Sequence, residues 1–115
     1  MEIIEYENEY QADFKRLNLE WLDKYDLTES HDLEILNDPI GTVIDKGGYI
    51  FLAREAGRVI GTAGLWKKNA KEYELVKMSV DPAYRGRGTS KLLLDRCLDE
   101  AKKNKCRKDF PFFKQ

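Results

Sequence analysis

The sequence predicts an α/β protein of the α+β type, with its elements in the order β-α-α-β-β-β-α. Three observations predict this class. Apolar residues near the N-terminus recur at three- and four-residue spacing, as in an amphipathic helix. Between residues 49 and 80, runs rich in β-branched and aromatic residues alternate with turns, as in consecutive strands. A glycine-rich turn then leads into a second amphipathic pattern, which predicts a helix from about Lys91.

The N-terminal third predicts one strand and two helices. The apolar run Glu2–Tyr6 is short enough for a first strand. The helix that follows carries an apolar stripe of Tyr10, Phe14, Leu17, Trp21 and Tyr25. Residues 28–30 supply cap candidates for a second, short helix, and Asp38-Pro39 is expected to end it, because the residue before proline disfavours helical angles.

The middle of the chain predicts three strands. Gly47-Gly48 precedes the run Tyr49–Arg54, and a turn at Gly57 connects it to Arg58–Trp66 as a hairpin. After a charged turn, Tyr73–Val80 is the next strand. The final helix has one apolar face and two four-spaced ion pairs on the other face. The apolar residues are Leu93, Leu94, Cys97, Leu98 and Ala101, and the pairs are Lys91/Asp95 and Asp99/Lys103.

Length, charge and cysteine content limit the function classes. The chain has 115 residues, enough for one domain with a single core. It has 20 basic and 21 acidic residues, so its overall charge does not indicate binding to nucleic acid or to an anionic membrane. Neither a membrane span nor a signal peptide is apparent, so we expect a cytoplasmic protein. Cys97, Cys106 and the single His31 lack metal-ligand spacing, so we expect reduced cysteines and no metal site.

The most informative segment is the strand, turn and helix start between Val76 and Ser90. Gly86 and Gly88 can adopt backbone angles that side chains forbid, so successive N–H groups can converge on an anion at the positive end of the helix. The turn lacks the Lys-Ser/Thr pair of a P-loop and has too few glycines for a dinucleotide fingerprint. The alternative is a glycine-rich connector that binds no ligand.

The run Arg85-Gly-Arg-Gly-Thr-Ser90 fits the pattern Arg-x-x-Gly-x-(Gly/Ala), with Ser90 in place of the last small residue. Preceded by Val80-Asp-Pro-Ala-Tyr84, it resembles the acetyl-CoA pyrophosphate loop of the GNAT superfamily of N-acyltransferases. Segments 21–25, 47–53 and 73–78 are also similar to bacterial members. The resemblance covers residues 1–103 as one acetyltransferase domain and implies a mostly antiparallel sheet with flanking helices.

This resemblance implies transfer of an acetyl group from acetyl-CoA to an amine of a small molecule or peptide. Backbone N–H groups across Arg85–Ser90 would hold the pyrophosphate, and the backbone of Met78–Val80 would pair with the pantetheine arm. The implied cofactor-binding residues are Met78, Ser79, Val80, Arg85, Gly86, Arg87, Gly88, Thr89 and Ser90. The Val80 N–H would donate to the oxyanion. The hydroxyls of Thr89 and Ser90 would contact phosphate or cap the helix.

The implied catalytic residue is Glu74, which would be the general base four residues before Met78. The alternative is an edge-strand glutamate that faces water or pairs with a lysine. His31 is expected to start a helix rather than to bind substrate. We expect Trp21 and Tyr25 to pack in the core; the alternative is that they line an acceptor pocket with Trp66.

The family pattern continues after the third helix with a fifth strand and with a tyrosine that acts as general acid. In this chain residues 104–115 form an atypical tail, and no tyrosine follows Tyr84. The resemblance therefore implies a fold truncated after the third helix, with the fourth strand at an open edge. Three interpretations stay open: a poorly active descendant, a homodimer in which Phe110–Phe113 covers apolar surface, and a non-catalytic acyl-CoA-binding module. A disordered tail is the alternative to the dimer.

Overall fold

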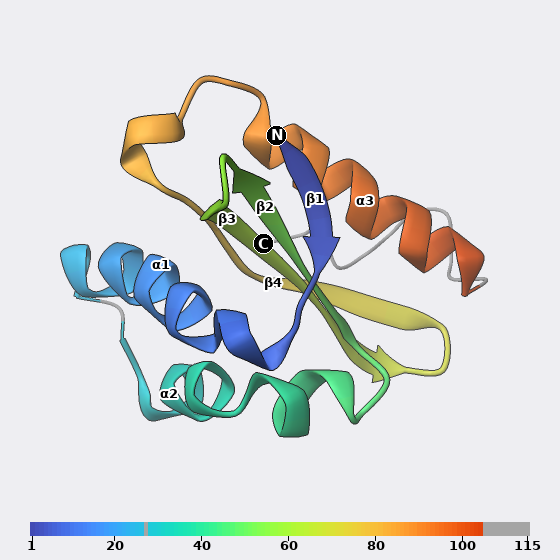
Figure 1. Cartoon of the computed structure of the whole chain (residues 1–115). Helices are drawn as coiled ribbons and strands as arrows, with labels where there is room; N and C mark the ends of the chain where they lie inside the picture. Colours follow the sequence, from blue (N-terminus) through green and yellow to red (C-terminus); the bar gives the residue numbers. More distant parts are fainter. Residues whose placement is uncertain (27, 105–115) are drawn as a thin grey trace.

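A computed structural model of the chain describes residues 1–26 and 28–104, and it contains one antiparallel sheet with helices on both faces (Figure 1). The strands lie in the order β1-β2-β3-β4; they are β1 (Glu2–Glu5), β2 (Tyr49–Glu55), β3 (Arg58–Asn69) and β4 (Glu72–Val80). The helices are α1 (Gln11–Lys24), α2 (Ser30–Asn37) and α3 (Thr89–Lys103). The predicted fold class, element order and antiparallel sheet are confirmed. The expected tail lies outside the described residues from position 105 onward.

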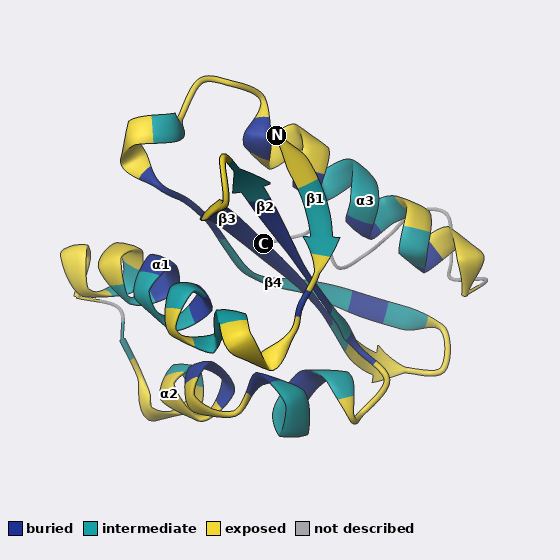
Figure 2. Cartoon of the chain, in the orientation of Figure 1, coloured by how far each residue is buried: buried dark blue, intermediate teal, exposed yellow. Residues whose placement is uncertain are grey.

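Each face of the sheet has its own apolar core, and the buried residues follow the strands that both cores share (Figure 2). On one face, α3 packs Leu93, Cys97 and Ala101 against the sheet. On the other face, α1 packs Phe14 and Leu17 against it, and α2 adds Ile35 and Leu36. Leu94 and Leu98, predicted for the α3 apolar face, are only partly buried.

The last turn of α1 departs from the prediction. Phe14 and Leu17 are buried, but Trp21 and Tyr25 are 41% and 52% exposed, so the expectation that they pack in the core is wrong. Their rings contact each other instead, with centroids 5.4 Å apart. The apolar stripe continues at helical spacing beyond the part of α1 that the sheet covers.

Several element ends also differ from the prediction. α3 begins at Thr89 rather than at Lys91, and its predicted Lys91–Asp95 pair forms at 2.9 Å. Arg96 and Glu100 form a second four-spaced pair at 2.9 Å, whereas the predicted Asp99/Lys103 ion pair does not form within the described residues. α2 begins at Ser30, where the Asp32 carboxylate accepts a hydrogen bond from the Glu29 N–H at 3.0 Å, and it ends before Asp38 as predicted. A π-helical turn at Ile40–Ile44, which the sequence did not indicate, connects α2 to β2.

β4 contains a bulge that shapes the region beside it. Between the pairs Thr62↔Ser79 and Gly64↔Val76, two residues of β4 oppose one residue of β3. Lys77, one of these two, has a φ of 50°, which is the left-handed region. Its carbonyl accepts a hydrogen bond from the Thr62 hydroxyl at 2.7 Å, and its ammonium pairs with Asp32 of α2. Tertiary contacts therefore hold this lysine in a conformation that favours glycine.

Hydrogen bonds from α1 to the sheet fix the helix over the bulge. The buried Asn18 amide donates to the Thr62 hydroxyl at 3.1 Å and to the Phe14 carbonyl at 2.8 Å. The Ser79 hydroxyl donates to the Leu17 carbonyl at 2.9 Å. Because buried polar groups are costly when unpaired, these contacts specify the position of α1 relative to the C-terminal half of β4.

Candidate functional site

The segment between β4 and α3 forms an open loop with two left-handed glycines. The Asp81 carboxylate accepts a hydrogen bond from the Ala83 N–H at 2.9 Å and starts a 3₁₀ turn at Pro82–Tyr84. Gly86 and Gly88 follow with φ values of 79° and 78°. A Cβ at either glycine would meet no atom within 4 Å. Backbone conformation, rather than crowding, therefore requires glycine at these positions, and the space above them is free.

The start of α3 leaves its first-turn N–H groups available. Gly88 occupies the N-cap position and brings no side chain to accept from them. The first four N–H groups of a helix lack intrahelical partners, and the N-terminus carries a partial positive charge. This glycine cap and the loop before it therefore present several N–H donors to an anion.

A groove of about 610 Å³ runs from the end of β4 across the loop to the first turn of α3. It is lined by Trp21, Met78, Ser79, Val80, Tyr84, Arg85, Gly86, Gly88, Thr89, Ser90 and Lys91. The fold thus brings together eight of the nine residues predicted for the cofactor. Arg87 is the exception: its guanidinium lies 5.2 Å from the Tyr84 ring centroid and 3.6 Å from a Glu55 oxygen, outside the groove lining.

The two hydroxyl residues at the start of α3 differ in orientation. Thr89 is 2% exposed, and its methyl group lies 3.2 Å from the position a Cβ would take at Gly61. Its side chain therefore faces the core, and only its backbone remains for an anion. Ser90 is exposed and lines the groove.

The open edge of β4 forms the other wall of the groove. Within the described residues, β4 is the last strand of the sheet and has a neighbour only in β3. The Asp81 N–H donates to the Ile60 carbonyl at 2.8 Å. Since successive N–H groups of a strand point in opposite directions, the Val80 N–H points away from β3, toward the open edge.

A smaller cavity of about 260 Å³ adjoins the groove beside the bulge. α1 contributes Asn18, Trp21 and Leu22, and the edge of β4 contributes residues 75–78. Trp21 and Met78 line both hollows, so the two share a wall. The helical spacing of apolar residues predicted that Trp21 packs in the core. Spacing alone does not show that Trp21 lies where the helix extends past the sheet.

Glu74 lies outside the linings of these two hollows. It pairs in register with Trp66 of β3, on the face of the sheet that α1 and α2 cover, and it is partly exposed. The Trp66 ring contacts the exposed His31 of α2, with centroids 5.9 Å apart. The fold therefore gathers Glu74, Trp66 and His31 at one end of β4 but does not place Glu74 beside the groove.

The family model of the GNAT acetyltransferases matches residues 5–111. The chain belongs to this family. A comparison with curated protein sequences finds no significant match.

Solved GNAT structures have the same fold. A GNAT acetyltransferase from Staphylococcus aureus is 27% identical, with a TM-score of 0.80 over 90% of this chain and 67% of that one. An acetyltransferase from Streptococcus agalactiae is 22% identical, with a TM-score of 0.79 over 91% of this chain and 68% of that one. A predicted acetyltransferase from Clostridium acetobutylicum, solved with acetyl-CoA, is 17% identical, with a TM-score of 0.76 over 93% of this chain and 77% of that one.

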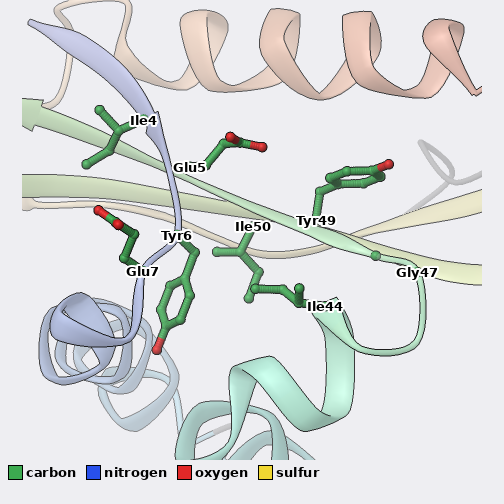
Figure 3. Close-up of a pocket in the computed structure, with 9 residues that line it drawn as sticks. Ile4, Glu5, Tyr6, Glu7, Ile44, Gly47, Tyr49 and Ile50 are labelled. Atoms are coloured by element: carbon green, nitrogen blue, oxygen red, sulfur yellow. The ribbon is translucent and has the colours of Figure 1, made fainter.

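This GNAT chain has a further cavity of about 570 Å³ where β1 ends and β2 begins, and it shares no lining residue with the groove (Figure 3). Tyr6, Ile44 and Ile50 lie on the side of α1 and α2, whereas Glu5 and Tyr49 lie on the side of α3. Its polar side chains do not converge on one point, so the cavity does not present a binding site comparable with the groove.

Cys97 is buried in the core beneath α3. Burial raises the pKa of the Cys97 thiol to about 12, which keeps it protonated and unreactive.

Among residues 1–26 and 28–104, no three His, Cys, Asp or Glu side chains are grouped to hold a metal ion. No helix in the described part of the chain is long and apolar enough to cross a membrane.

Proposed function

We propose that the chain is an acetyl-CoA-dependent N-acetyltransferase that transfers the acetyl group directly to an amine. One observation carries this proposal: the groove joins the N-terminus of α3, which brings no capping side chain, to the open edge of β4. An elongated ligand with a pyrophosphate at one end and an amide-rich arm at the other has complementary groups along this whole path. Membership of the GNAT family and the acetyl-CoA complex of the Clostridium acetobutylicum protein support the choice of ligand.

The residues of the groove fit this ligand. The N–H groups of the segment from Gly86 to Ser90 would hold the pyrophosphate, with Arg85 adding positive charge and Ser90 a hydroxyl. The backbone of Met78, Ser79 and Val80 would pair with the pantetheine arm as an added strand would. Arg87 is assigned only its backbone, because its side chain contacts Tyr84 and Glu55.

Acetyl-CoA supplies an activated thioester when it is bound. The protein would orient the amine nitrogen toward the acyl carbon, so that a C–N bond forms as the C–S bond breaks and the thiolate that leaves takes a proton from solvent. The Val80 N–H stabilises the negative charge on the carbonyl oxygen. Glu74 receives the amine proton; since Glu74 lies outside the groove lining, this transfer takes place through water.

Calorimetry with acetyl-CoA tests the binding half of the proposal, with dephospho-CoA and desulfo-CoA as controls. Saturable binding supports the site, and no binding at millimolar concentration rejects it. The transfer half is tested by thiol release with a panel of amines under saturating acetyl-CoA. Glu74→Gln then separates catalysis from binding, because the substitution removes the base and leaves the groove intact.

A non-catalytic acyl-CoA-binding or dimerising module is the second candidate function. Two observations favour it: Glu74 lies outside the groove, and β4 has an open edge within the described residues. An exposed edge can pair with a second chain. Saturable acetyl-CoA binding without amine-dependent thiol release would support this candidate, and light scattering would show whether the protein is a dimer.

A further inference from the structure

The cavity beside the bulge of β4 has the position and chemistry of a selective acceptor pocket. We infer that it takes a primary monoamine with a small aromatic body, such as a phenylalkylamine, and that it excludes polycationic and carboxylate-bearing acceptors. This inference rests on the proposed transferase function, because the cavity adjoins the groove assigned to acetyl-CoA.

Two polar side chains of the cavity lining, the Asn18 amide and the Lys77 ammonium, already donate to partners within the fold. The Asn18 amide donates both to Phe14 and to Thr62. The Lys77 ammonium is held by the Asp32 carboxylate, and their side chains are only 12% and 15% exposed. Neither group is therefore available to a substrate without loss of an internal bond.

The remaining side chains of the lining are apolar or aromatic. Trp21, Leu22, Leu75, Val76 and Met78 supply it, and none of the described residues around the cavity contributes a free carboxylate or a free cation. The partly exposed Trp21 ring offers a flat face at the junction with the groove. Aromatic bodies pack well against such surfaces, and a neighbouring ammonium gains a cation–π interaction.

The size of the cavity and the charge around it also favour a small monoamine. A water molecule occupies about 30 Å³ in the liquid, so a cavity of about 260 Å³ has room for a phenyl ring with a short chain but not for a multi-ring aminoglycoside. Outside the cavity, residues 20–26 carry three carboxylates, Glu20, Asp23 and Asp26, against the Lys24 ammonium, and Glu20 also pairs with Arg16 at 3.4 Å. The acidic excess that remains favours an ammonium group over a substrate carboxylate.

The test compares three probes: phenethylamine, phenylalanine, which adds a carboxylate to the same body, and kanamycin, a polycation. Binding is followed by amide chemical shifts of nitrogen-15-labelled protein without acetyl-CoA, so the readout does not depend on turnover. We expect phenethylamine to bind at least about tenfold more tightly than either other probe, with the shifts concentrated at residues 18–22 and 75–78.

Two variants of α1 are matched for this test. Leu22 lines the cavity and Leu19 does not, yet both are partly buried leucines of the same helix that pack on the same core. Leu22→Gln should weaken phenethylamine binding by about fivefold to tenfold, because it removes apolar contact. Leu19→Gln costs α1 the same helix propensity but removes no contact in the cavity, so that affinity should stay within about twofold.

Equal affinity for kanamycin, or an equal effect of the two variants, would overturn the acceptor assignment. Acetyl-CoA binding, measured separately by calorimetry, decides the fate of the proposed function. Phenethylamine binding at the cavity in a protein that does not bind acetyl-CoA would leave the pocket standing and reject the transferase.

Discussion

Gly88→Val tests the loop most directly, because the structure contains a matched position for comparison. Gly88 and Gly57 have φ values of 78° and 79°, and a Cβ at either one would meet no atom within 4 Å. A side chain in the left-handed region costs about 1–2 kcal/mol, and more for a β-branched residue. Both substitutions should therefore cost about 2 kcal/mol, which lowers the melting temperature by about 8 °C in a domain of this size.

The two variants should differ in ligand binding. Gly57 lies in the β2–β3 hairpin turn, whereas Gly88 aims the N–H groups of the groove. Relief of strain at Gly88 turns these donors away, and each charge-assisted hydrogen bond contributes about 1.5–3 kcal/mol. Loss of a single hydrogen bond then weakens the binding of acetyl-CoA at least about tenfold, since 1.4 kcal/mol corresponds to a factor of ten in affinity. Gly57→Val should keep the affinity of the unaltered protein.

Calorimetry with acetyl-CoA and thermal unfolding of both variants measure these quantities. The reasoning would be refuted if Gly88→Val kept its affinity within twofold while it lost as much stability as Gly57→Val. That result would show that the residue at position 88 does not control the N–H donors assigned to the pyrophosphate.

Three further predictions concern single side chains. Glu74→Gln should lower kcat for amine acetylation at least about tenfold while acetyl-CoA affinity changes less than twofold; an unchanged kcat would remove it as the base. Asp32→Asn should cost about 1–3 kcal/mol, because the Lys77 ammonium loses its partner. Burial raises the pKa of Asp32, but hydrogen bonds from Lys77 and the Glu29 N–H outweigh it and hold the pKa below 3.8. The ion pair therefore stabilises the fold above about pH 4, this contribution is lost as the pH falls through the lowered pKa, and the variant should show a flatter acid-unfolding profile. Tyr6→Phe should raise the melting temperature by a few degrees, because the buried Tyr6 hydroxyl has no hydrogen-bond partner in the described part of the chain; a lower melting temperature would contradict this.

The loop could be predicted from the sequence because its geometry depends on residues that are locally exceptional. Only glycine adopts positive φ without cost, so Gly86 and Gly88 mark the turn whatever surrounds them. The strands and α3 follow in the same way from periodicity, which each segment carries by itself.

The environment of Trp21 could not be predicted in this way. Helical spacing shows that Trp21 and Tyr25 share a face of α1 with Phe14 and Leu17, but it does not show where the sheet beneath that face ends. The exposure of both rings is a tertiary property. The same limit applies to Arg87, whose partners Glu55 and Tyr84 come from two different segments.

The bulge in β4 shows most clearly why local signals were insufficient. Tyr73 and Val80 are seven positions apart, so a regular strand would turn them to opposite faces, yet both are buried in the core beneath α3. The extra residue at Lys77 restores the facing by shifting the alternation by one position. No glycine marks this site, because Thr62 and Asp32 hold the lysine from other elements. The same shift places the bulge beside Trp21 and Leu22, where the cavity lies. The alternation that turns both Tyr73 and Val80 toward α3 and the hollow proposed for the amine therefore depend on one irregularity, so the proposed acceptor selectivity and the packing of β4 are coupled through Lys77.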